Sequence, residues 1–301
     1  MIHRAVTFVF AIALACAFTP ARGVFAHGDD DEGERAKNVQ PLPFEPTETL
    51  AYDAEFSKLM LRGIKIAEFT FTAGRAPDAP ADASNNASAS NVSAKQAASA
   101  DAPRLLFVGD VSSNGWFSKL FKIDFHFRVE SLVERAPFSV VRTTKLDEQG
   151  KRVRRSDAVF DRAGKVVSWT EIDPNDPNRQ PRVVTSPLEG AAHDIVSAIY
   201  FLRTQRLAHG QTFELTLSDS GQVYKVPARV SAERKAIKTV IGKVKVLRVD
   251  VELFGEGRPV QGEGKMSLWV TDDARRVPVR AKLSSKLGTL DIKLKAVNSK
   301  S

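Results

Sequence analysis

Cysteine is nearly absent from this chain of 301 residues, because the single cysteine is Cys16, close to the N-terminus. The chain starts with a short positive segment, residues 5–18 are almost entirely apolar or small, and small residues suited to signal peptidase end at Ala26. The apolar run is too short to span a membrane permanently. We therefore predict a secretory signal peptide over residues 1–26, cleaved after Ala26. The mature chain would then have no disulfide, cysteine nucleophile or cysteine metal site.

A lipidation site is the alternative interpretation of the same segment. Ala13-Leu14-Ala15-Cys16 is similar to a lipobox, in which Cys16 would carry a lipid and anchor the protein to a membrane. Leu14 is one place too close to the cysteine for that motif. The cleaved signal peptide is therefore the preferred prediction, and it leaves no transmembrane segment in the mature chain and places the protein in the periplasm or otherwise outside the cytoplasm.

Sequence signatures of catalysis are also missing. The chain has no G-x-S-x-G turn, no P-loop, no G-x-G-x-x-G and no H-E-x-x-H. Histidine is scarce, and the mature chain would keep only His27, His126, His193 and His209. We therefore expect no cofactor and no metal site, and a binding protein is favoured over an enzyme.

Acidic residues are outnumbered, with 36 Asp and Glu against 44 Lys and Arg and a formal net charge of +8. Removal of Arg4 and Arg22 with the signal peptide lowers this charge to +8 minus 2, or +6. A positive excess suits an anionic envelope lipid or polysaccharide, although an ordinary solvated surface has the same composition. The densest basic cluster, Lys151 to Arg155, lacks interleaved aromatics, so we expect the wet tip of a hairpin there and no nucleic-acid partner.

Two stretches have too few apolar residues to fold. His27 to Pro46 is acidic and then proline-rich, and residues 73–103 form a tract of Ala, Ser, Asn, Asp and Pro. We expect both to be disordered. The second tract lies between strand-like segments, so it is interpreted as a loop inserted into one β-rich domain over residues 47–297.

Apolar and polar residues alternate with a period of two over much of the remaining chain. Leu50 to Phe56, Ile123 to Glu130 and Leu290 to Lys295 each place their apolar side chains on one face of a strand. Turn signals rich in Asp and Gly separate such segments, at 147–150, 161–164, 219–221, 271–274 and 286–288. Strands with one buried and one wet face favour antiparallel pairing. The sequence thus predicts a mainly β fold, a large antiparallel sheet curved into a barrel or half-barrel.

Two segments depart from this alternation. Residues 191–206 repeat apolar side chains every three or four positions, which predicts an α-helix covering the face or mouth of the sheet, with Asp194 or Glu189 as the cap. Val246 and Leu247 are adjacent and both apolar, which predicts a β-bulge.

Several of these segments together resemble the bacterial family called domain of unknown function 3108. The segments are Leu50 to Tyr52, Gly63 to Lys65, the helix Asp194 to Arg203, Gly221 to Tyr224, Ile241 to Lys243 and the turn Leu268 to Pro278. The resemblance covers about residues 45–297, apart from the Ala/Ser tract. It implies an exported, β-rich envelope protein, and it brings no established catalytic residues.

Candidate ligand-binding residues fall into three groups. An amphipathic segment with Trp116, Phe117 and Phe121 could gate a trough in the sheet. His126 shares a strand face with Asp124, Arg128 and Glu130, which could form a binding or proton-relay row or a solvated face. The last group comprises residues of the helix and turn that resemble the family. Tyr200 and Trp269 could stack on a sugar ring, and Arg203 belongs to the same helix as Tyr200. Asp272 and Asp273 could bind a sugar or only close a turn.

Three functions remain compatible with these residues. The favoured one is a non-catalytic binding or carrier module, in which the curved sheet forms an apolar trough for a lipid or glycan of the envelope. An alternative is a hydrolase of envelope polysaccharide with paired carboxylates, for which Asp124, Asp272 and Asp273 are the candidates. A structural or assembly factor is the third.

Overall fold

The computed structural model describes residues 41–76, 104–113, 115, 118–119 and 124–299. The predicted signal peptide and its cleavage site lie outside these residues, as does most of both low-complexity stretches. Within the described part of the chain, no helix is long and apolar enough to cross a bilayer.

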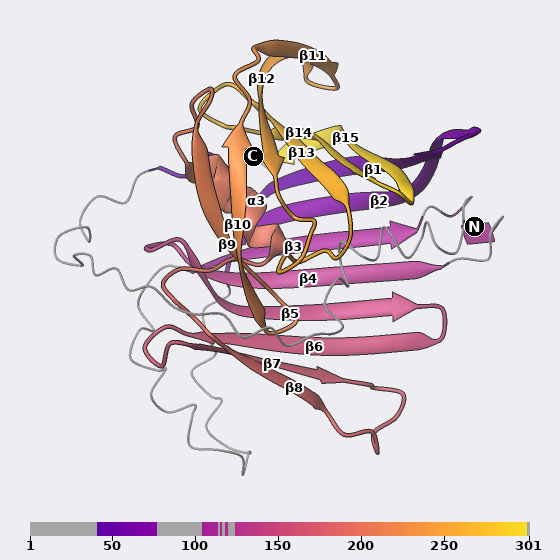
Figure 1. Ribbon diagram of the computed structural model, residues 1–301, viewed down its shortest axis with the longest axis vertical. Helices are drawn as coiled ribbons and strands as arrows, with labels where there is room; N and C mark the ends of the chain where they lie inside the picture. The colour runs from indigo at the N-terminus through magenta and orange to yellow at the C-terminus, as the bar shows by residue number, and fades with distance from the viewer. Residues whose placement is uncertain (1–40, 77–103, 114, 116–117, 120–123, 300–301) are drawn as a thin grey trace.

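The described chain folds into one antiparallel sheet of 15 strands with helix α3 packed against it (Figure 1). Alternating burial, as in the pattern of β1, gives each strand one face toward the core and one toward solvent. The strands are β1 (Glu48–Lys58), β2 (Leu61–Arg75), β3 (Arg104–Ser113), β4 (Phe125–Glu134), β5 (Ser139–Gln149), β6 (Arg152–Asp161), β7 (Val166–Ile172), β8 (Arg182–Pro187), β9 (Thr212–Asp219), β10 (Gln222–Val230), β11 (Lys235–Thr239), β12 (Gly242–Val251), β13 (Gly264–Thr271), β14 (Pro278–Ser285) and β15 (Gly288–Ser299).

The strands follow the order β8-β7-β6-β5-β4-β3-β2-β1-β15-β14-β13-β12-β10-β9, and β11 pairs with β12 beside this path. The sheet therefore ends at β8 and β9 and is not closed into a barrel. It is nevertheless strongly curved, so that its two ends approach each other. Gly221 in the β9–β10 turn lies against Trp169 of β7 and Val184 of β8. The predicted curved antiparallel sheet is confirmed, in its open form.

Helix α3 (Ile195–Thr204) lies on the concave side of the sheet, against β3, β4 and β9. Asp194 caps the helix by accepting hydrogen bonds from the backbone amides of Val196 and Ser197 at 2.9 and 3.0 Å, so the helix begins four residues later than the periodicity predicts. Val196 and Tyr200 pack into the core formed by β3–β8, whereas Ala198 and Leu202 pack into the core formed by β9, β10 and β12–β14. The helix thus joins the two halves of the sheet.

The structure differs from the sequence-based boundaries at three places. Phe44 is buried in the core, so the packed chain starts before residue 46. Ala73 belongs to β2 and is also buried, so the inserted tract starts later than residue 73. The predicted bulge at Val246 and Leu247 is wrong, because β12 pairs with β13 there without a shift in register. Both residues are buried because they belong to different core clusters, Val246 to the one with Tyr52 and Leu247 to the one with Val249. At this point of β12 its neighbour on one side changes from β11 to β10.

Candidate functional site

A row of charged side chains lies on the outer face of the sheet, the face turned away from α3. In β4 the residues Phe127 and Val129 are buried, while His126, Arg128 and Glu130 alternate with them and point outward. The structure therefore brings these three residues together on one face, as the alternation predicts.

His126 is held between two carboxylates. Its Nδ1 lies 2.9 Å from Glu148 Oε2 on β5, and its Nε2 lies 3.0 Å from Asp110 Oδ2 on β3. The hydrogen bond to Asp110 is the largest cause that raises the pKa of His126, with a smaller contribution from Glu148. Both ring nitrogens act as donors when the imidazole is protonated, which suits a fixed positive charge on this row.

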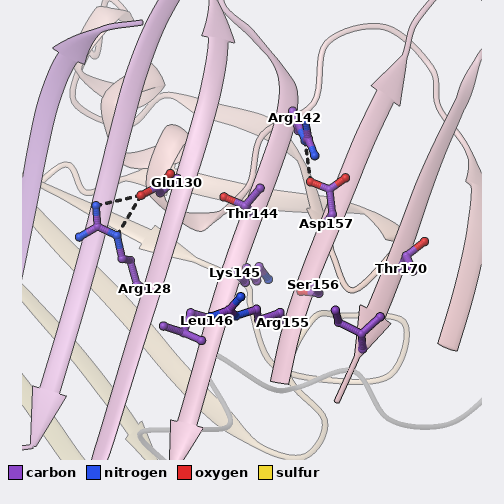
Figure 2. A pocket seen from close by; sticks show the side chains of 11 residues that line it. Arg128, Glu130, Arg142, Thr144, Lys145, Leu146, Arg155, Ser156, Asp157 and Thr170 are labelled. Atoms are coloured by element: carbon purple, nitrogen blue, oxygen red, sulfur yellow. Dashed lines mark hydrogen bonds and ion pairs between the residues drawn. The ribbon is translucent and has the colours of Figure 1, made fainter. Parts of the chain in front are cut away.

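A groove of about 540 Å³ lies beside this row, over β4–β7 (Figure 2). Two rows of side chains cross the strands at its floor and follow directly from the strand register. The first row is Arg128, Leu146, Arg155 and Ile172, and the second is Glu130, Thr144, Asp157 and Thr170. Cations thus alternate with apolar side chains in the first row, and carboxylates alternate with hydroxyl groups in the second.

Two of the three arginines of the groove are paired with carboxylates. Arg128 lies 2.8 Å from Glu130, and Arg142 lies 2.6 Å from Asp157. Arg155 is exposed, and the described residues include no ion-pair partner for it. The groove therefore carries one guanidinium that is free to bind an anion from solution.

Around α3, the concave side of the sheet, where the sequence predicts a trough, is packed with side chains. Tyr200 is fully buried and stacks on Phe107, with ring centroids 4.1 Å apart, and burial raises the pKa of its hydroxyl. In the part of the chain that the structure describes, the cavity near Asp194 and Asp219 has a volume of only about 10 Å³. That is about the space of one water molecule, so there is no room for an acyl chain there.

Arg203 is a core residue, although it was a candidate for ligand binding. Its guanidinium is fully buried and forms an ion pair with Glu48, itself 2% exposed. It also donates to the carbonyl oxygens of Pro43 and Arg275 at 3.3 and 3.1 Å. These bonds fasten α3 to the start of β1 and to the turn after β13, so Arg203 is not available to a ligand.

The turn after β13 is closed by Asp273. Its Oδ1 accepts hydrogen bonds from the hydroxyl of Thr271 at 2.8 Å and from the backbone amides of Arg275 and Arg276 at 3.0 and 3.1 Å. Asp272 is exposed beside it. The turn thus uses Asp273 for its own hydrogen bonds, which is the simpler of the two interpretations of this pair.

Trp269 does not offer a free ring for a sugar. The guanidinium of Arg280 lies over the indole, 5.3 Å from its centroid. Arg280 is in turn held by Asp291 through two bonds of 2.7 and 2.6 Å.

The carboxylates considered for a hydrolase are not brought together. Asp124 lies just before β4 and accepts a hydrogen bond of 2.8 Å from Ser113. Asp272 and Asp273 follow β13. In the order of the sheet, five strands lie between β4 and β13, namely β3, β2, β1, β15 and β14. Within the described ranges, no group of three or more His, Cys, Asp or Glu side chains could hold a metal ion. Trp116, Phe117 and Phe121 lie outside the described residues.

Of the polar groove residues, the sequence analysis did not identify Arg142, Thr144 and Asp157 among others, and it assigned Arg155 only to the tip of a hairpin. The necessary signal was available, because the turn signal at 147–150 fixes the β5–β6 hairpin and hence the pairing of Leu146 with Arg155. Following that register outward from the turn would have placed these side chains on one face with Arg128 and Glu130.

One solved structure of TM-score 0.50 agrees with this fold. A crystal structure of a β-barrel-like protein of domain of unknown function DUF1849 from Brucella abortus is similar over 85% of this chain and 98% of that chain, with 10% identity and a TM-score of 0.50. A crystal structure of a candidate lipoprotein from Parabacteroides distasonis is aligned over 85% of this chain and 97% of that chain, with 9% identity and a TM-score of 0.29. The search of curated proteins gives no significant match.

The family comparison gives the clearest result. The family model described as protein of unknown function (DUF3108) matches residues 85–295, which include strands β3 to β14, helix α3 and most of β15. The match starts later than the resemblance over residues 45–297 predicts, since it omits β1 and β2. It includes the Asp194-to-Arg203 helix and the turn after β13. The chain therefore belongs to the DUF3108 family of proteins of unknown function.

Proposed function

We propose that this protein is exported to the cell envelope, where it binds an acidic glycan in the groove over β4–β7 without catalysing a reaction. The observation that carries the proposal is the unpaired guanidinium of Arg155 at the centre of a groove that also offers hydroxyl and apolar groups. Export is supported by the predicted signal peptide over residues 1–26.

An acidic sugar matches the chemistry of this groove. A guanidinium binds a carboxylate or phosphate through two parallel hydrogen bonds. Thr144 and Thr170 can exchange hydrogen bonds with sugar hydroxyls, and Leu146 and Ile172 can pack against the carbon face of the ring. A lipid carrier is less well supported, because α3 and the aromatic side chains of the core pack together on the concave side where the sequence predicts a trough.

Binding to defined polysaccharides tests this proposal. The protein is produced in a bacterial host, purified from the periplasmic fraction and checked by mass spectrometry for an N-terminus at His27. Polygalacturonate and a phosphorylated oligosaccharide serve as acidic probes, and neutral dextran serves as the uncharged comparison. We expect saturable binding of at least one acidic probe by calorimetry and none of dextran.

The variant Arg155→Gln should weaken that binding by roughly 10- to 100-fold, the effect of losing one charge-assisted hydrogen-bonded contact. Arg62→Gln is the matched control, because Arg62 is also exposed and lies on β2, far along the sheet order from β6. Equal affinities for the two variants, or no acidic probe bound by the unaltered protein, would show that the groove is not the binding site.

A further inference from the structure

The hairpin formed by β11 and β12 projects from the body of the sheet, at the top of Figure 1. Among the described strands β11 pairs with β12 alone, and Thr239 pairs with Gly242, so Val240 and Ile241 form the two-residue tip. Val240 is 57% exposed and Ile241 is 42% exposed. The tip is fixed in place, since Thr239 Oγ1 donates to the Gly242 carbonyl at 2.9 Å and accepts from the Ile241 amide at 3.2 Å.

These two residues are unfavourable choices for a tight turn. Two-residue hairpin loops favour Asn, Asp and Gly, and β-branched apolar residues belong in strands. At the tip of the hairpin their side chains are exposed to water, so their burial does not contribute to the stability of the fold. Residue types that are unfavourable for the local structure are expected at functional sites, such as binding surfaces.

The cations of this hairpin make a second unfavourable choice. Residues 234–247 contain Arg234 and four lysines and no acidic residue. Lys238 lies directly opposite Lys243 across the hairpin, an arrangement in which like charges repel. The part of the chain that the structure describes includes no ion-pair partner for any of these five cations, whereas charges on β1, β2 and β15 are extensively paired.

The two faces of the hairpin have different surroundings. Ile237 and Val244 lie opposite each other and pack against the core cluster that contains Tyr52 and Val246. Lys238, Lys243 and Lys245 share the other face, which is exposed. The hairpin is therefore anchored on one side and presents an apolar tip flanked by three lysines on the other.

We propose that the β11–β12 hairpin docks the protein on the surface of an anionic phospholipid bilayer. Val240 and Ile241 enter the interface between headgroups and acyl chains, and the three lysines contact lipid phosphates. A nucleic acid could neutralise the lysines but has no apolar surface for the tip, and an acidic protein would need an apolar pocket beside its carboxylates, whereas a bilayer interface offers both kinds of contact. This inference does not rest on the glycan-binding groove, because β12 and β5 lie far apart in the order of the sheet.

Vesicle co-sedimentation tests this docking surface. The exported protein is mixed with phosphatidylcholine vesicles prepared with and without phosphatidylglycerol. We expect binding only to the anionic vesicles, with a loss of binding as the salt concentration rises. Replacing Lys238, Lys243 and Lys245 together by Gln should reduce partitioning by on the order of 100-fold, the effect of three lysines at an anionic surface.

The tip is tested separately by replacing Val240 and Ile241 with Ser, which should reduce partitioning by about tenfold or more. Val183→Ser is the matched control for the tip, because Val183 is 62% exposed on the edge strand β8. Gln at Lys151, Lys265 and Lys282, which are also exposed, is the matched control for the charges. The far-UV circular dichroism spectrum of each variant reports whether it has folded.

Two results would overturn the inference. One is that the unaltered protein does not bind anionic vesicles, including the case in which it binds heparin or DNA through the same lysines. The other is that the lysine and tip variants bind vesicles as strongly as their controls. Arg155→Gln should keep vesicle binding, and the hairpin variants should keep glycan binding, so failure of one proposal is distinguishable from failure of the other.

Discussion

Arg203 illustrates how a charged residue can belong to the core. Its guanidinium is surrounded by the carboxylate of Glu48, two backbone carbonyls and the rings of Phe44 and Tyr200, at 5.1 and 5.5 Å from the ring centroids. A buried ion pair of this kind gains little net energy when intact, but removing one partner leaves an unpaired charge in the interior. Arg203 therefore fixes the relative positions of α3, β1 and the turn after β13.

Replacing Arg203 with Met should lower the free energy of unfolding by about 3 to 5 kcal/mol, because Glu48 keeps only its 3.4 Å contact with Arg275. Urea unfolding followed by circular dichroism measures the effect. Arg248→Met is the control, since its partners are the half-buried Asp250 and the exposed Glu233, and this change should cost less than about 1 kcal/mol. Similar losses in the two variants would mean that the Arg203 pair has no special structural role.

At the scale of elements, the contact between α3 and β3 depends on a single glycine. A Cβ added to Gly109 would lie 2.7 Å from Cγ2 of Val196 and 3.2 Å from the ring of Phe71. Gly109 lies within the β3 ladder, and the atoms that face it belong to the side chains of Val196, in the first turn of the helix, and of Phe71 on β2. The helix could not approach the sheet so closely if residue 109 had a side chain.

Gly109→Ala should therefore destabilise the protein by about 1 to 3 kcal/mol through overpacking. Gly74→Ala is the matched control on β2, because its added Cβ would meet only the carbonyl oxygen of Leu106 at an ordinary 3.5 Å. Thermal unfolding of the two variants gives the comparison. A melting temperature for Gly109→Ala equal to that of Gly74→Ala would contradict the close packing of α3 on β3.

Most of the elements could be predicted from local patterns. Leu50, Tyr52, Ala54 and Phe56 are all buried on one face of β1, as their alternation predicts, since a period of two is a direct consequence of strand geometry. The bulge at Val246 was not correctly predicted, because the pairing partner of a strand is a tertiary property. The same applies to the groove, whose residues come together only through the register of four strands.

The candidate binding residues were predicted less well, for a related physical reason. Tyr200 and Arg203 attract attention as polar or aromatic residues in a family-like helix, but their roles depend on Phe107 and Glu48, which lie far away in the sequence. A motif alone does not distinguish a ligand contact from a tertiary one. His126 was correctly placed on the outer face because its neighbours on the same strand were sufficient to predict its direction.

At the scale of the whole molecule, stability should depend on pH through His193. This residue is 2% exposed and stacks on Phe201 at 4.2 Å, and burial lowers its pKa to about 4 despite the opposing charge of Asp194. The unfolded chain, with an ordinary histidine pKa near 6.5, binds a proton more readily than the folded one in this range. The contribution of neutral His193 is therefore fully present above about pH 6.5 and is lost as the pH falls toward about 4.

We expect this residue alone to cost about 2 kcal/mol of unfolding free energy between about pH 7 and about pH 5. His193→Phe, which keeps an aromatic ring against Phe201, should remove that part of the pH dependence in urea titrations at the two pH values. His126→Gln is the control with the opposite sign. The raised pKa of His126 stabilises the fold at low pH, so its loss should steepen the decline. An unchanged pH dependence in His193→Phe would mean that His193 does not titrate as its burial implies.

The position of β1 beside β15 has a consequence for how the molecule is made. Thr49 pairs with Asn298, so the two strands at the centre of the sheet are the first and last of the described strands in chain order. Until β15 has been synthesised, β1 has one unpaired edge, and an unpaired edge is open to association with other chains. Within each half of the sheet, most neighbouring strands follow each other in the chain and can pair locally. The pairing of β1 with β15, which joins the two halves, requires that β15 has been synthesised. A chain truncated before β15 would lack this pairing and expose a long row of unpaired backbone N–H and C=O groups on β1.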